Sequence, residues 1–114
     1  MKNNDDVLNL VFKKNDNIEY EINDEDIVTI LEKQDHKIQR FFRKLKLRIP
    51  MYKRIELDKY SSYIFLQIDG IKNVKELGKD LELKYGKKAY PLYERLLLFL
   101  NHICENCNYI EKLN

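Results

Sequence analysis

The sequence of 114 residues predicts an α+β fold in which a three-stranded antiparallel sheet is followed by three α-helices. Three observations indicate this order. Apolar and polar residues alternate in the first half of the chain, which is the pattern of half-buried strands. Apolar residues spaced three and four apart dominate the second half, which is the pattern of amphipathic helices. Each expected helix also begins and ends at residues that favour helix termini.

The first two strands are predicted to form a hairpin. Ile18, Tyr20 and Ile22 alternate with polar residues, and a second alternating stretch runs over residues 27–31. Residues 23–26 between them, Asn-Asp-Glu-Asp, have the composition of a turn. The alternation directs one face of the hairpin toward a core and leaves the other face in water.

Pro50 marks the start of the third strand. Proline has no amide hydrogen and biases the residue before it toward extended geometry, so the strand is expected over residues 52–57. Ile55 and Leu57 then share one face. The preceding residues, 36–50, fit a short amphipathic helix as well as a loop.

The beginning of the chain has two interpretations. Residues 7–12 are compatible with an additional extended segment or with a flexible arm. We therefore divide the chain into an N-terminal arm, residues 1–17, and one domain, residues 18–114. A chain of this length builds a single core.

The first two helices are predicted from their termini. Asp58 is a good N-cap for a helix over residues 59–68, and Asp69-Gly70 supplies its end. Residues 73–76, Asn-Val-Lys-Glu, resemble a capping box that opens the second helix, and Gly86 stands where a left-handed residue ends it. The buried face of the second helix is expected to carry Val74, Leu77, Leu81 and Tyr85.

The last helix is predicted to be the longest and is unusually apolar. Pro91 fits its first turn, and Asn108 tolerates the left-handed conformation at its end. One apolar stripe consists of Leu92, Leu96, Phe99 and Ile103, and a second consists of Tyr93, Leu97, Leu100 and Cys104. Either the helix is buried on two sides, or part of this surface lines a groove for an apolar partner segment.

Short motifs in this region resemble the PqqD-like family, the peptide chaperones of pyrroloquinoline quinone biosynthesis. Leu57-Asp58, Asp69-Gly70 and Val74-x-Glu76-Leu77 match the family pattern, whereas Ser61-Ser62 replaces Gly-Ala and Phe65 replaces Trp. The similarity covers about residues 18–112. It implies a winged-helix-like domain that recognises the leader of a ribosomally made precursor peptide. The domain would present that leader to a radical SAM or other peptide-modifying enzyme.

The resemblance also implies where the leader binds. In this family mode the peptide adds as a strand and lies between the third strand and the third helix. Carried over by position, the peptide-binding residues are Arg54, Ile55, Glu56, Leu57, Leu92, Arg95, Leu96 and Phe99. Ile55 and Leu57 also suit an ordinary core. Arg95 suits an acidic leader residue, and equally an internal pair with Glu94 or Asp69.

The charge is distributed unevenly, although the net charge is only +2. Residues 36–54 contain eight Lys or Arg and no acid, interleaved with aromatic residues. This segment is a solvated loop that offsets the acidic first third, a surface for an acidic leader or enzyme, or a contact with nucleic acid. The expected partner-facing residues are Lys37, Arg40, Arg43 and Lys44. The alternative function is therefore a winged-helix nucleic-acid-binding protein, although the predicted helices offer few side chains to base edges.

No catalytic or metal constellation is evident, so we do not expect an enzyme or a cofactor. Cys104 and Cys107 have a Cys-x-x-Cys spacing, which brings both sulfurs to one side of a helical turn. Without a second pair, however, four zinc ligands cannot be completed within the chain. We expect two reduced thiols near a helix end, and a lone His102 that is structural or exposed.

The sequence context indicates a cytoplasmic protein. The first residues are polar and acidic, unlike a signal peptide, and no apolar run approaches the ~20 residues of a membrane helix. The expected partners are a leader peptide and a peptide-modifying enzyme, with a homodimer left open and no membrane partner.

Overall fold

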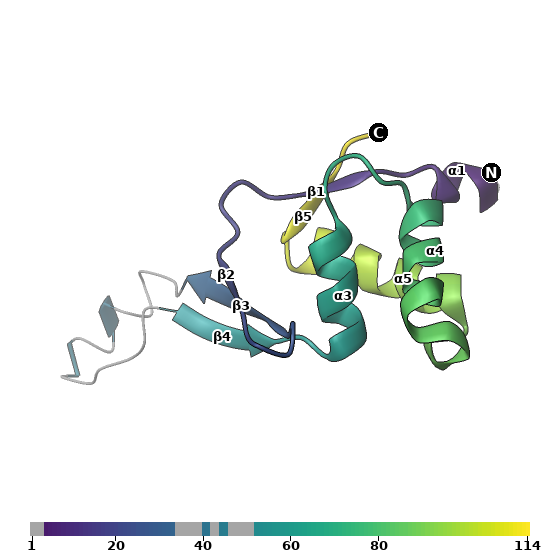
Figure 1. Cartoon of the computed structure of the whole chain (residues 1–114). Helices are drawn as coiled ribbons and strands as arrows, with labels where there is room; N and C mark the ends of the chain where they lie inside the picture. Colours follow the sequence, from purple (N-terminus) through teal and green to yellow (C-terminus); the bar gives the residue numbers. More distant parts are fainter. Residues whose placement is uncertain (1–3, 34–39, 42–43, 46–51) are drawn as a thin grey trace.

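The computed structural model describes residues 4–33, 40–41, 44–45 and 52–114. It is an α+β structure in which a three-stranded antiparallel sheet precedes the main helices, as predicted (Figure 1). The elements in chain order are α1 (Asn4–Leu8), β1 (Phe12–Lys14), β2 (Tyr20–Ile22), β3 (Val28–Lys33), β4 (Tyr52–Glu56), α3 (Lys59–Gln67), α4 (Val74–Tyr85), η1 (Gly86–Ala89), α5 (Leu92–Asn101), η2 (His102–Asn106) and β5 (Ile110–Lys112).

The predicted hairpin and third strand are confirmed. The sheet has the order β2-β3-β4, and Ile30 in the central strand lies opposite Tyr20 on one side and Ile55 on the other. The side chain of Asn23 holds the turn because its Oδ1 accepts hydrogen bonds from the amides of Glu25 and Ile27, at 2.8 and 3.0 Å. Such local side-chain hydrogen bonds make Asn a strong turn residue.

The predicted helix termini are also confirmed. Asp58 accepts a hydrogen bond from the Ser61 amide at 2.8 Å, and Asn73 forms a reciprocal capping box with Glu76. Gly86 adopts a positive φ of 61° at the end of α4. Asn108 adopts a φ of 57° just after η2.

The last helix does not stay regular to its end. After α5 it continues as a π-helical turn, η2, in which the Cys107 amide donates to the His102 carbonyl at 3.2 Å. Leu96, Leu100 and Ile103 are at most 1% exposed. Leu100 belongs to the second stripe, whose other members, Tyr93, Leu97 and Cys104, are only half-buried. The helix is therefore buried along one side and partly covered along the next.

A second, two-stranded sheet was not predicted. β1 pairs antiparallel with β5, with Phe12 opposite Lys112, so a strand near the beginning of the chain lies beside a strand near its end (Figure 1). Phe12 is 6% exposed, and its carbonyl accepts a hydrogen bond from the Gly70 amide at 3.1 Å. Neither interpretation of residues 7–12 fits Val7 and Leu8, which belong to the helix α1. The extended interpretation holds from Val11 onward, because this segment joins the core.

The core centres on α3. Phe65 is fully buried and meets the Tyr20 ring edge-on at 5.0 Å between centroids. Ser62 is also fully buried, and its hydroxyl accepts from the Val28 amide at 2.9 Å and donates to the Leu57 carbonyl at 3.3 Å. Ser62 therefore joins the end of the β3–β4 ladder to α3.

The helices α4 and α5 approach closely at Gly78. A Cβ atom at this position would lie 2.8 Å from the Tyr93 hydroxyl and nearer still to the Tyr93 ring. The hydroxyl itself donates to the Lys75 carbonyl at 3.2 Å. Every helix in the described part of the chain is too short or too polar to span a lipid bilayer.

Candidate functional site

The strand part of the predicted site lies on an edge strand. Among the described residues β4 pairs only with β3, so its other edge is open. Arg54 and Glu56 are exposed on the outer face of the sheet, whereas Ile55 and Leu57 are half-buried on the inner face and pack against the core. The core role expected for Ile55 and Leu57 is therefore present.

One hydrogen bond shows which backbone groups of β4 face β3 and which face the open edge. The Leu57 amide donates to the Val28 carbonyl at 2.9 Å, so the backbone of Leu57 faces β3. Backbone groups of successive strand residues point to alternate sides. The N–H and C=O groups of Arg54 and Glu56 therefore face outward, toward the open edge.

Arg54 is already engaged by a neighbour. Its Nη2 donates to Glu21 Oε2 at 2.7 Å across the outer face, and this hydrogen bond lowers the pKa of Glu21 and raises the pKa of Arg54. Both side chains are more than half exposed, so the pair is screened by water and contributes little to stability. It does hold the Arg54 side chain over β3 and away from the open edge.

The helix part of the predicted site is mostly core. Leu92 is 8% exposed and Leu96 is fully buried, so both belong mainly to the core. Phe99 is half-buried, and Arg95 is exposed. A small cavity of about 60 Å³ is lined by Asp58, Tyr60, Ser61, Ile64, Leu81, Ala89, Arg95, Leu96 and Phe99.

This cavity differs from the predicted groove in one respect. The wall opposite α5 is formed by the start of α3, residues 58–64, and not by β4. The eight residues carried over from the family pattern are therefore not brought together around one hollow. The reason is that α3 follows β4 directly and packs between that strand and α5.

Arg95 has neither of the internal partners considered from the sequence. Its guanidinium lies over the Tyr60 ring at 5.3 Å and donates to the Lys88 carbonyl at 3.3 Å. Asp69 instead accepts from the amides of Ile71 and Lys72, both at 2.9 Å. A cation held over an aromatic face keeps its charge available to a ligand at the cavity rim.

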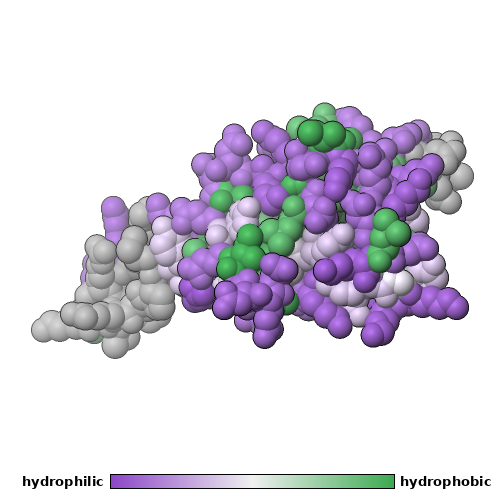
Figure 2. Space-filling view, viewed as in Figure 1, coloured by the Kyte–Doolittle hydropathy of each residue, from purple (hydrophilic) through white to green (hydrophobic). Residues whose placement is uncertain are grey.

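The predicted basic patch falls largely outside the described residues. Arg40 and Lys44 are exposed, whereas Lys37 and Arg43 are not among the residues described. Elsewhere the surface is mainly hydrophilic, and hydrophobic residues form separate small patches on the face shown in Figure 2. Ile71, Leu83 and Leu98 are more than 70% exposed.

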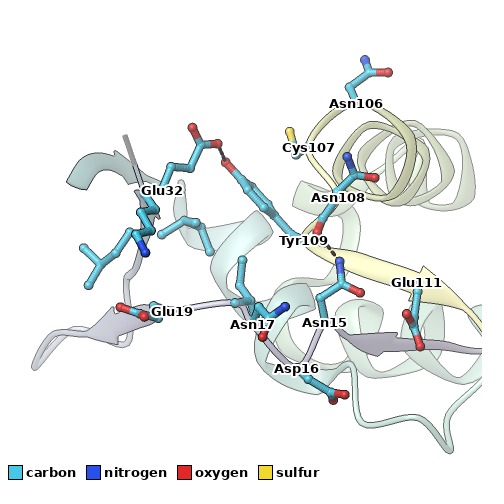
Figure 3. A pocket seen from close by; sticks show the side chains of 14 residues that line it. Asn15, Asp16, Asn17, Glu19, Glu32, Asn106, Cys107, Asn108, Tyr109 and Glu111 are labelled. Atoms are coloured by element: carbon cyan, nitrogen blue, oxygen red, sulfur yellow. Dashed lines mark hydrogen bonds between the residues drawn. The ribbon is translucent and has the colours of Figure 1, made fainter. Parts of the chain in front are cut away.

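One large hollow of the described structure could not be predicted from the sequence. It is an open cleft of about 760 Å³ between the inner end of the β2-β3-β4 sheet, the linker after β1 and the C-terminal segment (Figure 3). Its lining is polar and includes four asparagines and four carboxylates, namely Asn15, Asn17, Asn106, Asn108, Asp16, Glu19, Glu32 and Glu111. No sequence motif indicates this cleft, because it joins three segments that are far apart in the chain.

Tyr109 connects the two walls of this cleft. Its hydroxyl donates to Glu32 Oε1 on β3, and burial together with this carboxylate raises the pKa of Tyr109 strongly (Figure 3). The side chain of Asn15 bonds to the Asn108 carbonyl beside it. These contacts fix the C-terminal segment against the sheet.

The two cysteines do not share one side of the helix end, contrary to the expectation from their spacing. Cys107 lines the cleft, whereas Cys104 lines a separate cavity with Val7, Phe12 and Leu97. The π-helical turn between them accounts for the difference, since its winding is wider than that of an α-helix. Within the described residues, no group of three or more His, Cys, Asp or Glu could hold a metal ion.

Comparison of the chain with models of protein families, with curated proteins and with solved structures finds no match in any of the three.

Proposed function

We propose that this chain is a non-catalytic adapter that binds an extended leader peptide as an added strand on β4 and presents it to a peptide-modifying enzyme. The observation that carries the proposal is the open edge of β4, where the backbone groups of Arg54 and Glu56 face outward. An unpaired strand edge is a ready template for an extended peptide. The resemblance to the PqqD-like family supports the leader peptide and the radical SAM enzyme as partners.

The small cavity between the start of α3 and α5 would supply specificity. Side chains of an added strand alternate between the two faces of the sheet, so every second one would point toward the inner face and the start of α3. The cavity of about 60 Å³ beside Tyr60 and Phe99 has room for a small aliphatic side chain. Arg95 at the same cavity would then pair with an acidic residue of the peptide.

The exposed face of α5 favours a peptide over nucleic acid. A helix that reads DNA presents several cations or amides to the base edges. The exposed residues of α5 are Glu94, Arg95, Leu98 and Asn101, and the single cation among them is held by Tyr60 and Lys88. Binding that weakens steeply with salt would instead favour the nucleic-acid alternative.

A substitution at Glu56 tests strand addition directly. Its N–H faces the open edge, so Glu56→Pro removes a donor for the incoming strand and leaves the hydrogen bonds to β3 intact. Proline is tolerated at such edge positions. The matched control is Glu56→Thr, which loses the same carboxylate but keeps the N–H. Peptides are selected from a displayed library of extended sequences and measured by isothermal titration calorimetry.

We expect Glu56→Pro to lower peptide affinity about tenfold or more, while Glu56→Thr binds nearly as tightly as the unaltered chain. Both variants should unfold at similar temperatures, which shows that the sheet is retained. Arg95→Glu should in addition disfavour peptides with an acidic residue at one fixed position. Equal affinity of the proline and threonine variants would exclude strand addition on β4.

A further inference from the structure

The π-helical turn η2 brings together the side chains of His102 and Cys107, which would point apart on an α-helix, and Asn106 also lies beside His102. Cys107 Sγ lies 3.5 Å from His102 Nε2, and Asn106 Nδ2 lies 3.2 Å from His102 Nδ1. In a π-helix the backbone hydrogen bond joins residues five apart, so His102 and Cys107 stand on the same side of the turn. In an α-helix the same two residues would diverge, because five residues exceed one full turn.

The thiol of Cys107, the imidazole of His102 and the amide of Asn106 follow one another in the arrangement found around activated nucleophiles. In such sites a base lies within hydrogen-bonding reach of the nucleophile and is itself oriented by a third group. Nε2 of His102 can accept the thiol proton. The other ring nitrogen can donate to the amide oxygen of Asn106 once that amide is turned over, since its two ends are interchangeable in shape.

The sulfur also has access to a substrate-sized space. Cys107 lines the cleft of about 760 Å³, and Figure 3 shows it on the same wall as Tyr109, across from Glu32. Burial raises the pKa of the Cys107 thiol, and the negative charge of Glu32 raises it further, against the opposing effect of a hydrogen bond with Tyr109. At neutral pH the sulfur is therefore protonated, so its reaction requires a neighbouring base.

We propose that Cys107 is a nucleophilic thiol that accepts an acyl group from a thioester in this cleft, with His102 as the base that takes its proton. The sulfur of Cys107 attacks the thioester carbonyl while the thiol proton moves to His102 Nε2. The carbon–sulfur bond to the leaving group then breaks, and the leaving thiolate takes the proton from the imidazolium. The products are an acylated Cys107 and a free thiol, so no oxidant, reductant or metal is required.

The polar lining of the cleft suits an acyl group that carries hydrogen-bonding groups. Asparagine side chains both donate and accept, and Asn17 and Asn108 lie along the cleft with Cys107. The role is stoichiometric, because the acyl group stays on the protein until another nucleophile removes it. It is independent of peptide binding at β4.

Cys104 provides an internal comparison. It lies three residues away, is likewise half-buried, and burial raises the pKa of its thiol as well. Among the described residues, however, no imidazole lies beside it, and it lines a different and largely apolar cavity. If burial and position along the chain alone decided reactivity, the two thiols would react alike.

The test uses the full chain with the acetyl thioester of N-acetylcysteamine at neutral pH. Acetylation is followed by intact mass and is assigned to a cysteine by peptide mapping. We expect acetylation of Cys107 and little of Cys104, with Cys104→Ser unchanged in rate. His102→Gln should slow acetylation of Cys107 about tenfold or more, since a positioned base contributes strongly to proton transfer. Circular dichroism of each variant verifies that it is folded.

Three results would overturn the proposal. The first is acetylation of Cys104 as fast as that of Cys107. The second is an unchanged rate for Cys107 in a folded His102→Gln variant. The third is bound zinc that blocks acetylation until a chelator removes it, because Cys107 and His102 would then be metal ligands.

Discussion

The replacement of Ser62 by alanine tests the physical role of the buried hydroxyl of this residue. In the structure, the buried hydroxyl accepts the Val28 amide at 2.9 Å and donates to the Leu57 carbonyl at 3.3 Å. Ser62→Ala is therefore expected to destabilise the fold.

The size of the expected loss in stability follows from the Val28 amide and the Leu57 carbonyl, which lose their hydrogen-bond partner in Ser62→Ala. Ser62 and Val28 are both fully buried, so water cannot replace the lost hydroxyl. An unsatisfied buried donor costs about 1–3 kcal/mol. A loss of 1 kcal/mol lowers the melting temperature of a domain this size by roughly 4 °C or more. Urea unfolding followed by circular dichroism gives the free energy of unfolding directly.

Ser61→Ala is the matched control. Within the described structure the Ser61 hydroxyl makes no hydrogen bond, and the Asp58 cap binds its backbone amide, which alanine retains. This variant should stay within about 0.5 kcal/mol of the unaltered chain. If Ser62→Ala unfolds at the same urea concentration as Ser61→Ala, the hydroxyl does not support the β3–β4 ladder and the reasoning is wrong.

Two further substitutions test other contacts. Gly78→Ala should lower the free energy of unfolding by about 1 kcal/mol, because the clash with Tyr93 outweighs the higher helix propensity of alanine. In a Tyr93→Ala background the same change should stabilise the fold. Stabilisation of the fold in both backgrounds would contradict the close approach of α4 and α5. Hydrogen bonds from the amides of Lys72 and Ile71 lower the pKa of Asp69 below its ordinary value of 3.8. The ionised carboxylate therefore stabilises the fold above about pH 3.8, and this stabilisation is lost as the pH falls through the lower pKa of Asp69 in the folded protein. Asp69→Asn should therefore lose less stability than the unaltered chain between pH 6 and pH 3 in urea unfolding, and an identical loss would exclude this role.

The helix boundaries could be predicted because their signals are local. The Asp58 cap, the Asn73–Glu76 box and the left-handed Gly86 and Asn108 each act within about four residues of the chain. The β2–β3 hairpin was predictable for the same reason, since a short turn brings its alternating strands together.

The candidate peptide site was only partly predictable. The position of β4 after Pro50 was correct, and its open edge in the described sheet agrees with the requirement for strand addition. The burial of Leu92 and Leu96 in the core could not be predicted, because an apolar stripe on a helix has the same appearance whether a ligand or the core covers it.

The sequence by itself determined the order of the three-stranded sheet and the main helices after it, the ends of those helices and the face of that sheet that turns inward, because these depend on neighbouring residues and on periodicity. Only the tertiary structure decided the pairing of β1 with β5, the cleft closed by Tyr109 and Glu32, and the contact of Cys107 with His102. β1 and β5 have three residues each, too few to show an alternation, and they lie almost a full chain length apart. Their pairing is stabilised by long-range burial of Phe12 and Ile110, which no local pattern encodes.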